Sequence, residues 1–201
     1  MDVSDQKKFD RMCCPRGVAV YGGVSKIGSF ANSVFLSLVK YGYKGRLFPV
    51  SPSGGEVAGF KTIKNLSEAN GPIDLASISV PAEAVPSVLE ECLDYGVAGV
   101  QIHTSGFAET GTPEGEALQR ELVKYASKGL KIVGPNCFGI HCPKGGITLL
   151  PGFDFEQESG PLAMISQSGG VANDFGHEAG LAGLGISKVV SFGNGCDLDA
   201  V

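Results

Sequence analysis

A run of glycine and small polar residues near the start of the chain is the first candidate for chemistry. It reads Gly22-Gly23-Val24-Ser25-Lys26-Ile27-Gly28 and lies between an apolar stretch and a helix-period segment. Backbone amides at such a turn, aided by the positive end of the helix dipole, bind anions such as a pyrophosphate. The run is neither a GxGxxG fingerprint nor a P-loop, because Ser29-Phe30 replaces the Lys-Ser/Thr pair of the latter. The alternative interpretation of this turn is a tight βα connection without a ligand.

The end of the next expected strand distinguishes between nucleotide types. An NAD site places an Asp or Glu there, where the carboxylate binds the ribose hydroxyls. Here the strand ends in Val50-Ser51-Pro52, and the next acidic residue is Glu56. This pattern disfavours NAD and permits a ligand with a phosphorylated ribose, such as coenzyme A, which a carboxylate would repel.

Three further groups of small polar residues follow expected strands. They are Ser79-Val80-Pro81, His103-Thr104-Ser105-Gly106-Phe107 and Ser166-Gln167-Ser168-Gly169-Gly170. The first two lie at the carboxyl edge of the sheet, where open α/β sheets bind ligands, and their hydroxyl groups suit a phosphate or an amide. The third opens a helix, so its free amides form a second candidate anion site. Ordinary N-capping by Ser168 is the alternative interpretation.

Other catalytic patterns are weak. Cys137, His141 and Cys142 offer ligand atoms, but no second CxxC-type pair completes a zinc site, so we expect no metal. Ser168 lies in no GxSxG elbow and has no evident His/Asp pair for nucleophilic catalysis. His177 falls on an expected helix and is interpreted as a surface or packing residue.

The elements that position these residues alternate between apolar strand-length runs and helix-period segments, which is typical of a parallel sheet built from βαβ units. We expect strands at residues 17–21, 46–50, 73–80, 97–103 and 130–133, with helices at 29–41, 81–95 and 113–128. These elements form a complete, doubly wound α/β domain. A less regular stretch at 140–160 follows. The pattern then restarts with strands at 162–166 and 187–192 and a helix at 171–182.

The expected organisation has four parts. It comprises an N-terminal lead-in at residues 1–15, a Rossmann-like domain at 16–145, a linker at 146–160 and the start of a second α/β domain at 161–201. A single βαβ unit buries too little surface to be stable alone. We therefore expect the second domain to be truncated at residue 201 or to dock onto the first.

Composition restricts the class of protein. Charged residues make up 18% of the chain and glycine 30 of 201 residues, which suits buried strands joined by tight loops. The net charge of −5, without basic runs, disfavours a nucleic-acid partner. Neither a membrane span nor a signal peptide is visible, and six irregularly spaced cysteines suit reduced thiols in a cytoplasm.

Ordered blocks of residues extend these local patterns over nearly the whole chain after Cys14. They are GVAVYGGVSKIGS, GRLFPVSP, DLASISVPAEAVPSVLEEC, GFAET, GPNCFGI, GPLAMISQSGG and SKVVSFGNGCDLD. In this order and spacing the chain resembles the ADP- (NDP-) forming acyl-CoA synthetase family and the related α-subunit of succinyl-CoA synthetase. The resemblance implies a Rossmann-like CoA-binding domain followed by the beginning of a flavodoxin-like domain.

The resemblance also implies the site residues. Coenzyme A would contact Gly22, Val24, Ser25, Lys26, Ile27, Ser51, Pro52, Val80, Pro81, His103, Thr104 and Ser105. Asn136 and Cys137 would lie near the thiol end. Ser166, Ser168 and Gly169 would support the loop of a phosphohistidine that is expected beyond residue 201.

One position departs from the family pattern. Succinyl-CoA synthetase has a lysine shortly after the second strand that meets the CoA phosphate, and Gly54 falls near that position here. Lys26 and Lys61 are the candidate replacements.

As the resemblance implies, the full enzyme would interconvert an acyl-CoA, ADP and phosphate with a carboxylic acid, ATP and CoA. ATP or ADP, with Mg, would bind in an ATP-grasp domain or subunit, and the assembly would be an oligomer. This chain alone would bind CoA without turnover. Two alternatives stay open. One is a CoA-binding regulatory module without ligase activity, as in fusions with an acetyltransferase, and the other is an NAD(P)-binding oxidoreductase domain.

Overall fold

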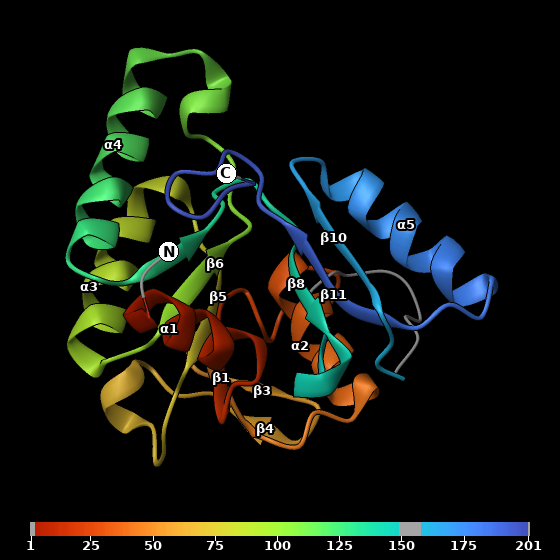
Figure 1. Cartoon of the computed structure of the whole chain (residues 1–201). Coiled ribbons are helices and arrows are strands. Elements are labelled where there is room, and N and C mark those ends of the chain that lie inside the picture. Colours follow the sequence, from red (N-terminus) through yellow and green to blue (C-terminus); the bar gives the residue numbers. More distant parts are fainter. Residues whose placement is uncertain (1–2, 149–157, 201) are drawn as a thin grey trace.

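The computed structural model describes residues 3–148 and 158–200, which form two main sheets (Figure 1). The larger sheet has five parallel strands in the order β2-β1-β5-β6-β7. They are β1 (Gly17–Gly22), β2 (Arg46–Val50), β5 (Leu75–Ser79), β6 (Gly99–Ile102) and β7 (Lys131–Val133). These are the five strands expected for the first domain, with ends shifted by at most a few residues. The prediction of a parallel α/β sheet is confirmed.

Helices cover both faces of this sheet, as a doubly wound fold requires (Figure 1). The helices α1 (Val3–Cys13) and α2 (Phe30–Tyr41) pack on one face, and α3 (Val85–Tyr95) and α4 (Pro113–Ser127) pack on the other. Helix α1 is a difference from the expected lead-in. The mean hydropathy of its residues is low, and it is held mainly by the burial of its last turn.

Capping residues set the ends of these helices. Ser29 accepts a hydrogen bond from the amide of Asn32 at the start of α2, and Gly42 ends that helix with φ 78°, which glycine adopts without strain. The expected helix at 81–95 begins instead with a 3-10 turn, η2 (Ala82–Ala84), which precedes α3.

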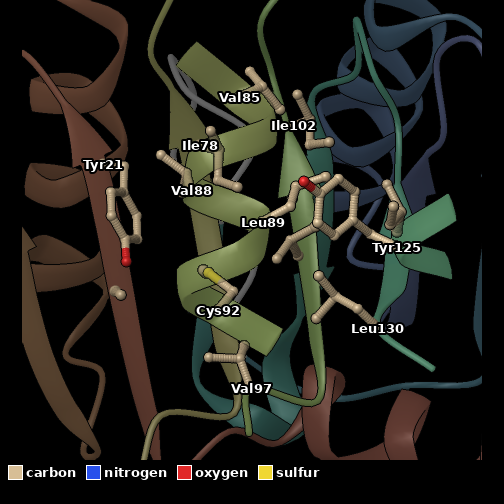
Figure 2. Close-up of a cluster of buried hydrophobic side chains, with 14 of the residues drawn as sticks. Tyr21, Ile78, Val85, Val88, Leu89, Cys92, Val97, Ile102, Tyr125 and Leu130 are labelled. Atoms are coloured by element: carbon tan, nitrogen blue, oxygen red, sulfur yellow. The ribbon is translucent and has the colours of Figure 1, made fainter. Parts of the chain in front are cut away.

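Figure 2 shows the core between α3 and the sheet. Tyr21, Ile78 and Ile102 of the strands and Leu89 of α3 belong to this core, and each of these residues is at most 4% exposed. Val20, one residue before Tyr21, enters the core under α2 instead, because successive strand residues point to opposite faces. Burial of each such side chain contributes roughly 1.5–3 kcal/mol. The sheet is therefore filled on both faces and forms a rigid base for its carboxyl edge.

A buried carboxylate ties α1 to the opposite, amino edge of the sheet. Asp74, just before β5, accepts two hydrogen bonds from the Arg11 guanidinium and two from that of Arg16, at 2.6–2.8 Å. It also accepts a bond from the Arg16 amide at 2.9 Å. Burial alone would raise the pKa of Asp74, but the hydrogen bonds from Arg16 and Arg11 outweigh it and hold that pKa well below its usual range. The carboxylate is thus charged at neutral pH.

The second sheet has four strands in the order β10-β11-β8-β9. They are β10 (Leu162–Ser166), β11 (Ile186–Ser191), β8 (Gly139–Cys142) and β9 (Ile147–Thr148), and α5 (Gly169–Leu181) packs beside β10 and β11. Strands β10 and β11 are parallel, whereas β8 is antiparallel to both β11 and β9. The strand–helix–strand pattern expected here is present.

Residues 139–148 differ from the expected irregular stretch. They form β8, a 3-10 turn η4 (Pro143–Gly145) and β9, although β8 lies in the range expected for the first domain and β9 in the expected linker. Both strands pair within the second sheet, so this sheet includes residues that were expected in the first domain and in the linker. Residues 149–157 of the expected linker lie outside the described residues.

Short elements complete the described chain. They are the hairpin strands β3 (Glu56–Val57) and β4 (Phe60–Lys61) and the 3-10 turns η1 (Leu66–Glu68) and η3 (Ala108–Thr110). Among the described residues, no helix combines the length and apolar character needed to cross a membrane.

Candidate functional site

The main candidate site is a cleft at the carboxyl edge of the five-stranded sheet. In chain order the strands of this sheet are arranged 2-1-3-4-5, so the direction of winding reverses between β1 and β5. Open α/β sheets bind ligands outside the strand ends at such a reversal. A cleft of about 530 Å³ lies there, bounded by the ends of β1, β2 and β5 and by α3. Its position follows directly from the strand order.

The walls of the cleft include five of the expected CoA contacts. These are Gly22, Ser51, Pro52, Val80 and Pro81. Together with Val50 and Val88, the two prolines and Val80 make the walls largely apolar, which suits a flat ring system. The remaining expected contacts lie outside this lining, in the neighbouring loops.

The lining also includes side chains that were not expected from the sequence, among them Tyr21, Lys64 and Glu91. The Tyr21 hydroxyl donates to one oxygen of Glu91 at 3.1 Å, and the amide of Leu66 donates to the other. Burial, reinforced by the charge of Glu91, raises the pKa of Tyr21 and keeps its hydroxyl a donor. The Glu91 carboxylate is therefore engaged in holding the cleft wall.

Lys64 lies in the cleft lining because the chain passes beside the end of β2 for a second time at residue 63. Ile63 bridges to Val50 at the end of that strand, and the amide of Lys64 is held by the Glu68 carboxylate at 2.9 Å. Lys64 is exposed and is the cationic side chain in the cleft lining. Lys26 and Lys61, the two candidates from the sequence, do not line the cleft. The bridge between Ile63 and Val50, which are distant in sequence, places Lys64 beside the end of β2, whereas Lys61 lies in β4.

The turn after β1 has the geometry of an anion site. Gly22 has φ 127°, and a Cβ there would lie 2.7 Å from the carbonyl oxygen of Ser79, so glycine is required. Amides of Val24, Lys26 and Ser29 donate to carbonyls of the turn itself. Within the described residues, the amides of Ser25, Ile27 and Gly28 have no acceptor. Such donors at the start of α2 are suited to a phosphate.

Side chains of this turn divide between core and surface. Val24 is fully buried, and its carbonyl accepts from the Asn32 amide group at 2.8 Å, so it would meet a ligand through its backbone. Lys26 and Ile27 are exposed, Ile27 by 92%. The buried hydroxyl oxygen of Ser25 has no partner among the described residues. Backbone amides and Ser25 are therefore the groups ready to bind.

His103 is half-buried, and both of its ring nitrogens are hydrogen-bonded to protein groups. Its Nδ1 donates to the carbonyl of Cys137 at 3.0 Å, so Nε2 is the acceptor for Ser77 and Gln101, each at 2.9 Å. Burial lowers the pKa of His103 to about 4, which keeps the ring neutral and preserves this pattern. With both nitrogens occupied, the ring positions the ends of β5 and β6.

Hydrogen bonds bring the other expected loops together beside His103. The Thr104 hydroxyl donates to the carbonyl of Val80 at 2.6 Å, and the Asn136 amide donates to the carbonyl of Thr104 at 3.0 Å. Ser105 and Asn136 are exposed next to these bonds. The sequence-predicted residues after β5, β6 and β7 thus form one continuous edge.

Cys137 lies under this edge with its thiol in the core. Its Sγ donates to the carbonyl of Ile102 at 3.3 Å, and the residue is 3% exposed. Burial raises the pKa of Cys137 to about 12, so the group is a protonated thiol at neutral pH. Its surroundings suit a structural role rather than a nucleophile.

The serine-rich turn between β10 and α5 is a capped helix start. The Ser166 hydroxyl donates to the carbonyl of Ser168 at 2.9 Å, and the Ser168 hydroxyl accepts from the Val171 amide at 3.4 Å. Capping by Ser168, the alternative interpretation of this turn, therefore occurs. A Cβ on Gly169 would lie 2.7 Å from the ring of Phe138, so this ring packs directly against the helix start.

Phe138, which the sequence analysis did not single out, connects the two helix starts. Its ring centroid lies 6.1 Å from that of Phe30, the first residue of α2, and Phe30 lies 4.7 Å from His103. The starts of α2 and α5 therefore face one aromatic cluster, although more than 130 residues separate them. No short-range sequence signal identifies this convergence.

We place neither a metal ion nor His177 in this candidate site. Among residues 3–148 and 158–200, no group of three His, Cys, Asp or Glu side chains is placed to hold a metal ion. His177 is half-buried on α5, away from the start of that helix.

Comparison with known proteins supports the assignment of the two regions. Residues 16–143 match the family model "CoA binding domain", and residues 159–201 match "Succinyl-CoA ligase like flavodoxin domain". The α-subunit of acetate–CoA ligase [ADP-forming] I from Pyrococcus furiosus is 40% identical over 197 residues. That alignment covers 92% of this chain and 41% of the relative. Acetate–CoA ligase [ADP-forming] from Methanocaldococcus jannaschii is 36% identical, with 92% and 25% covered.

Solved structures give the same result. The dinucleotide-forming acetyl-coenzyme A synthetase 1 of Ca. Korarchaeum cryptofilum, in its apo form, superimposes with a TM-score of 0.86 at 33% identity. It covers 96% of this chain and 41% of that chain. The present chain thus spans about two fifths of the length of this structure and of the P. furiosus relative. The CoA-binding domain model matches more than half of the chain. The chain therefore belongs to the CoA-binding domain family, in the form found in ADP-forming acyl-CoA synthetases.

Proposed function

We propose that the cleft binds coenzyme A and that the chain is the CoA-binding part of an ADP-forming acid–CoA ligase. The observation that carries this proposal is the position of the cleft at the reversal between β1 and β5, beside the free amides of Ser25, Ile27 and Gly28. A diphosphate needs several donors in a concave arrangement at a helix start. The family match supports the same ligand.

The chemistry of the cleft suits the nucleotide half of CoA. Pro52, Val80 and Pro81 offer apolar walls for an adenine ring, and Lys64 offers a cation for a phosphorylated ribose. The end of β2 provides Ser51 where an NAD site has an acid. The acid within the cleft, Glu91, has each carboxylate oxygen occupied by a protein donor.

The thiol half of CoA would extend along the edge formed by Ser105 and Asn136 toward Phe138. There the turn at Ser166–Gly169 would present its amides to a phosphorylated histidine supplied by sequence outside this chain. Amides at a helix start stabilise phosphoryl charge. Binding energy from the nucleotide half would hold the thiol in place for the reaction.

The proposed reaction of the whole protein converts an acyl-CoA, ADP and phosphate into a carboxylic acid, ATP and CoA. The chain's own residues would bind and orient CoA, while ADP, Mg and the acid would bind mainly elsewhere. An ATP-grasp domain or subunit is the proposed partner, in an oligomeric assembly. A cytoplasmic location stays a prediction.

Calorimetric titration with CoA, 3′-dephospho-CoA and NADH tests the ligand. We expect heat of binding for CoA, weaker binding for 3′-dephospho-CoA and none for NADH. Binding of NADH without CoA would overturn the proposal in favour of an oxidoreductase domain.

The Ser25→Glu variant tests the turn after β1. A carboxylate beside the free amides would repel a diphosphate, so we expect CoA affinity to fall by about 100-fold or more, equivalent to ~3 kcal/mol. Ser127→Glu, at the exposed end of α4, is a control with the same change in charge. Equal affinity of the Ser25 variant and the wild type, with both folded by circular dichroism, would remove this turn from the site.

The Lys64→Gln variant tests the phosphorylated ribose. An exposed lysine–phosphate contact contributes about 1 kcal/mol, so we expect a roughly five- to tenfold loss of CoA affinity. Affinity for 3′-dephospho-CoA should change little, because that ligand lacks the contacting phosphate. Lys61→Gln, on β4, is the matched control. Equal losses for both ligands would contradict the assignment of Lys64.

A further inference from the structure

The segment that follows β11 leaves the second sheet and runs along β7 of the first. Leu198 forms a parallel bridge to Val133 of β7, and its amide donates to the carbonyl of Ile132 at 3.1 Å. The amide of Cys196 donates to the carbonyl of Gly134 at 3.0 Å. β7 is the last strand in the order of its sheet, so this segment covers the outer edge of that sheet. The chain thus ties the second sheet to the first at β7.

Asn194 lies near the start of this segment, and its side chain is tied to the loop after β6. The side-chain nitrogen of Asn194 donates to one carboxylate oxygen of Glu109 at 2.5 Å. Glu109 also accepts from the amides of Gly106 and Phe107, at 2.6 and 3.2 Å. Burial alone would raise the pKa of Glu109, but these hydrogen bonds, that from Asn194 foremost, lower it. Glu109 therefore fixes the turn that carries Ser105, and Asn194 fixes Glu109.

The backbone of the same segment is tied to the loop after β7. The Asn194 amide donates to the carbonyl of Pro135 at 2.9 Å, immediately before Asn136. Gly193 has φ 58°, and a Cβ there would lie 2.3 Å from the carbonyl oxygens of Pro135 and Asn136, so glycine is required for this approach. The segment thus supports both Ser105 and Asn136, along which we place the thiol half of CoA. We call these two residues the thiol edge.

A bond to α4 fixes the direction of the Asn194 side chain. Its nitrogen also donates to the side-chain oxygen of Gln119 at 2.8 Å, and that oxygen accepts from the amide of Ala108 at 3.3 Å. Asn194 and Gln119 are both half-buried. An asparagine amide group has two hydrogens to donate, and here Glu109 and Gln119 accept them. The network therefore requires a donor at position 194 and an acceptor at position 109.

We propose that Asn194 is a positioning residue, which holds the thiol edge in place relative to the serine-rich turn after β10; this inference rests on the proposed function. Two residues before Asn194, the amide of Phe192 donates to the carbonyl of Ser166 at 3.0 Å, at the end of β10. The segment from Phe192 to Asn194 therefore connects that turn with the loops after β6 and β7. A loop that is already held in its binding conformation costs less free energy to order when a ligand arrives.

The two halves of CoA separate this role from a general contribution to stability. The cleft proposed for the nucleotide half is bounded by the ends of β1, β2 and β5, and its lining includes neither Asn194 nor Glu109. Loss of the network should therefore weaken the contacts of the thiol half and leave those of the nucleotide half intact. The informative readout is the ratio of the affinities for CoA and for adenosine 3′-phosphate 5′-diphosphate, which is the nucleotide half alone.

The Asn194→Asp variant tests the bond to Glu109, with affinities measured by calorimetry. The new side chain has the same shape, but it lacks the donor and places a second carboxylate beside Glu109. We expect CoA affinity to fall by roughly five- to tenfold and affinity for adenosine 3′-phosphate 5′-diphosphate to stay within about twofold of the wild type. Asn70→Asp, the same exchange at an exposed position before β5, should change neither affinity. Equal losses for both ligands, or no loss for CoA, would overturn the inference.

A second exchange should restore the pair. Glu109→Gln alone turns an amide nitrogen toward that of Asn194, so it should also lower CoA affinity. In the double variant Glu109→Gln/Asn194→Asp, the new glutamine donates to the new aspartate, and Gln119 can turn its amide group to donate as well. We expect CoA affinity to return to within about threefold of the wild type. A double variant that loses as much affinity as both single variants together would show that the two residues do not act through their bond, against the inference.

Amide hydrogen exchange without ligand, followed by NMR, separates this inference from the proposed function. In Asn194→Asp the amides of Gly106 and Asn136 should exchange about tenfold faster than in the wild type, whereas the amide of Val24, in the turn after β1, should be unaffected. Unchanged exchange at Gly106 and Asn136 would overturn the positioning role alone, with CoA binding by the wild type intact. A wild-type chain that binds no CoA would instead overturn the proposed function, and the role of Asn194 with it.

Discussion

The units β1–α2 and β10–α5 share a local design but differ in their surroundings. Each is a strand followed by a turn rich in serine and glycine and by a helix that a serine caps. Helix α2 buries Phe35, Leu38 and three other residues, whereas α5 buries only small or polar ones: Ala172, Asn173, Gly176 and Ala179. Because apolar area buried determines stabilisation, α2 is the more firmly held of the two.

The strands show the same contrast. β1 lies between β2 and β5, and five of its six residues are buried. β10 is at the edge of its sheet and alternates between half-buried and exposed residues, with Ile165 59% exposed. A similar local motif therefore gives a well-packed unit in one region and a weakly packed unit in the other. The strands and helices that pack around each unit decide which outcome occurs.

The largest expected effect comes from the core of the first unit. Leu38→Ala removes a fully buried side chain and should reduce the free energy of unfolding by about 3 kcal/mol. Leu181→Ala, on α5, removes a side chain that is 71% exposed and should cost less than about 0.5 kcal/mol. Urea denaturation of both variants measures the difference. Equal losses would contradict the contrast between the two units.

The carboxylate at the amino edge of the first sheet should give a smaller, pH-dependent effect. Asp74→Asn replaces charged hydrogen bonds with neutral ones and should cost about 2 kcal/mol at pH 7. The pKa of Asp74 is lower in the folded chain, so its stabilisation is present above pH ~4 and is lost as the pH falls below that value. The difference between wild type and variant should therefore shrink between pH 5 and pH 3. A constant difference in denaturation experiments would show that charge plays no part.

The smallest expected effects concern the two caps. Ser29→Ala removes a bond to the Asn32 amide at 3.1 Å and a second bond, to the Gly23 carbonyl at 2.6 Å, and should cost about 1–2 kcal/mol. Ser168→Ala removes a longer bond of 3.4 Å to the Val171 amide and should cost about 0.5 kcal/mol. Thermal melts of both variants measure these changes. A larger loss for Ser168 would place more stability in the second unit than its packing indicates.

Much of the fold was predictable because short-range patterns carry it. The strands at 46–50 and 162–166 match the structure to the residue, since apolar runs and flanking turns define strands locally. Helix α1 was missed because its mean hydropathy is low, and its contacts with the sheet hold it in place. β8 and β9 were missed because their pairing with β11 and with each other is specified by distant partners.

The candidate site, like the fold, was only partly predictable from the sequence. The sequence alone predicted that a glycine-rich turn, a strand ending without an acid and two polar loops lie at one edge of a parallel sheet, since the carboxyl ends of parallel strands are aligned. Only the tertiary structure decided which side chains enter the cleft. It buried Val24, tied both ring nitrogens of His103 to protein groups, and brought Lys64 and Glu91 to the cleft wall. The physical reason is that a loop residue takes its direction from hydrogen bonds and packing with partners remote in sequence, which no local pattern encodes.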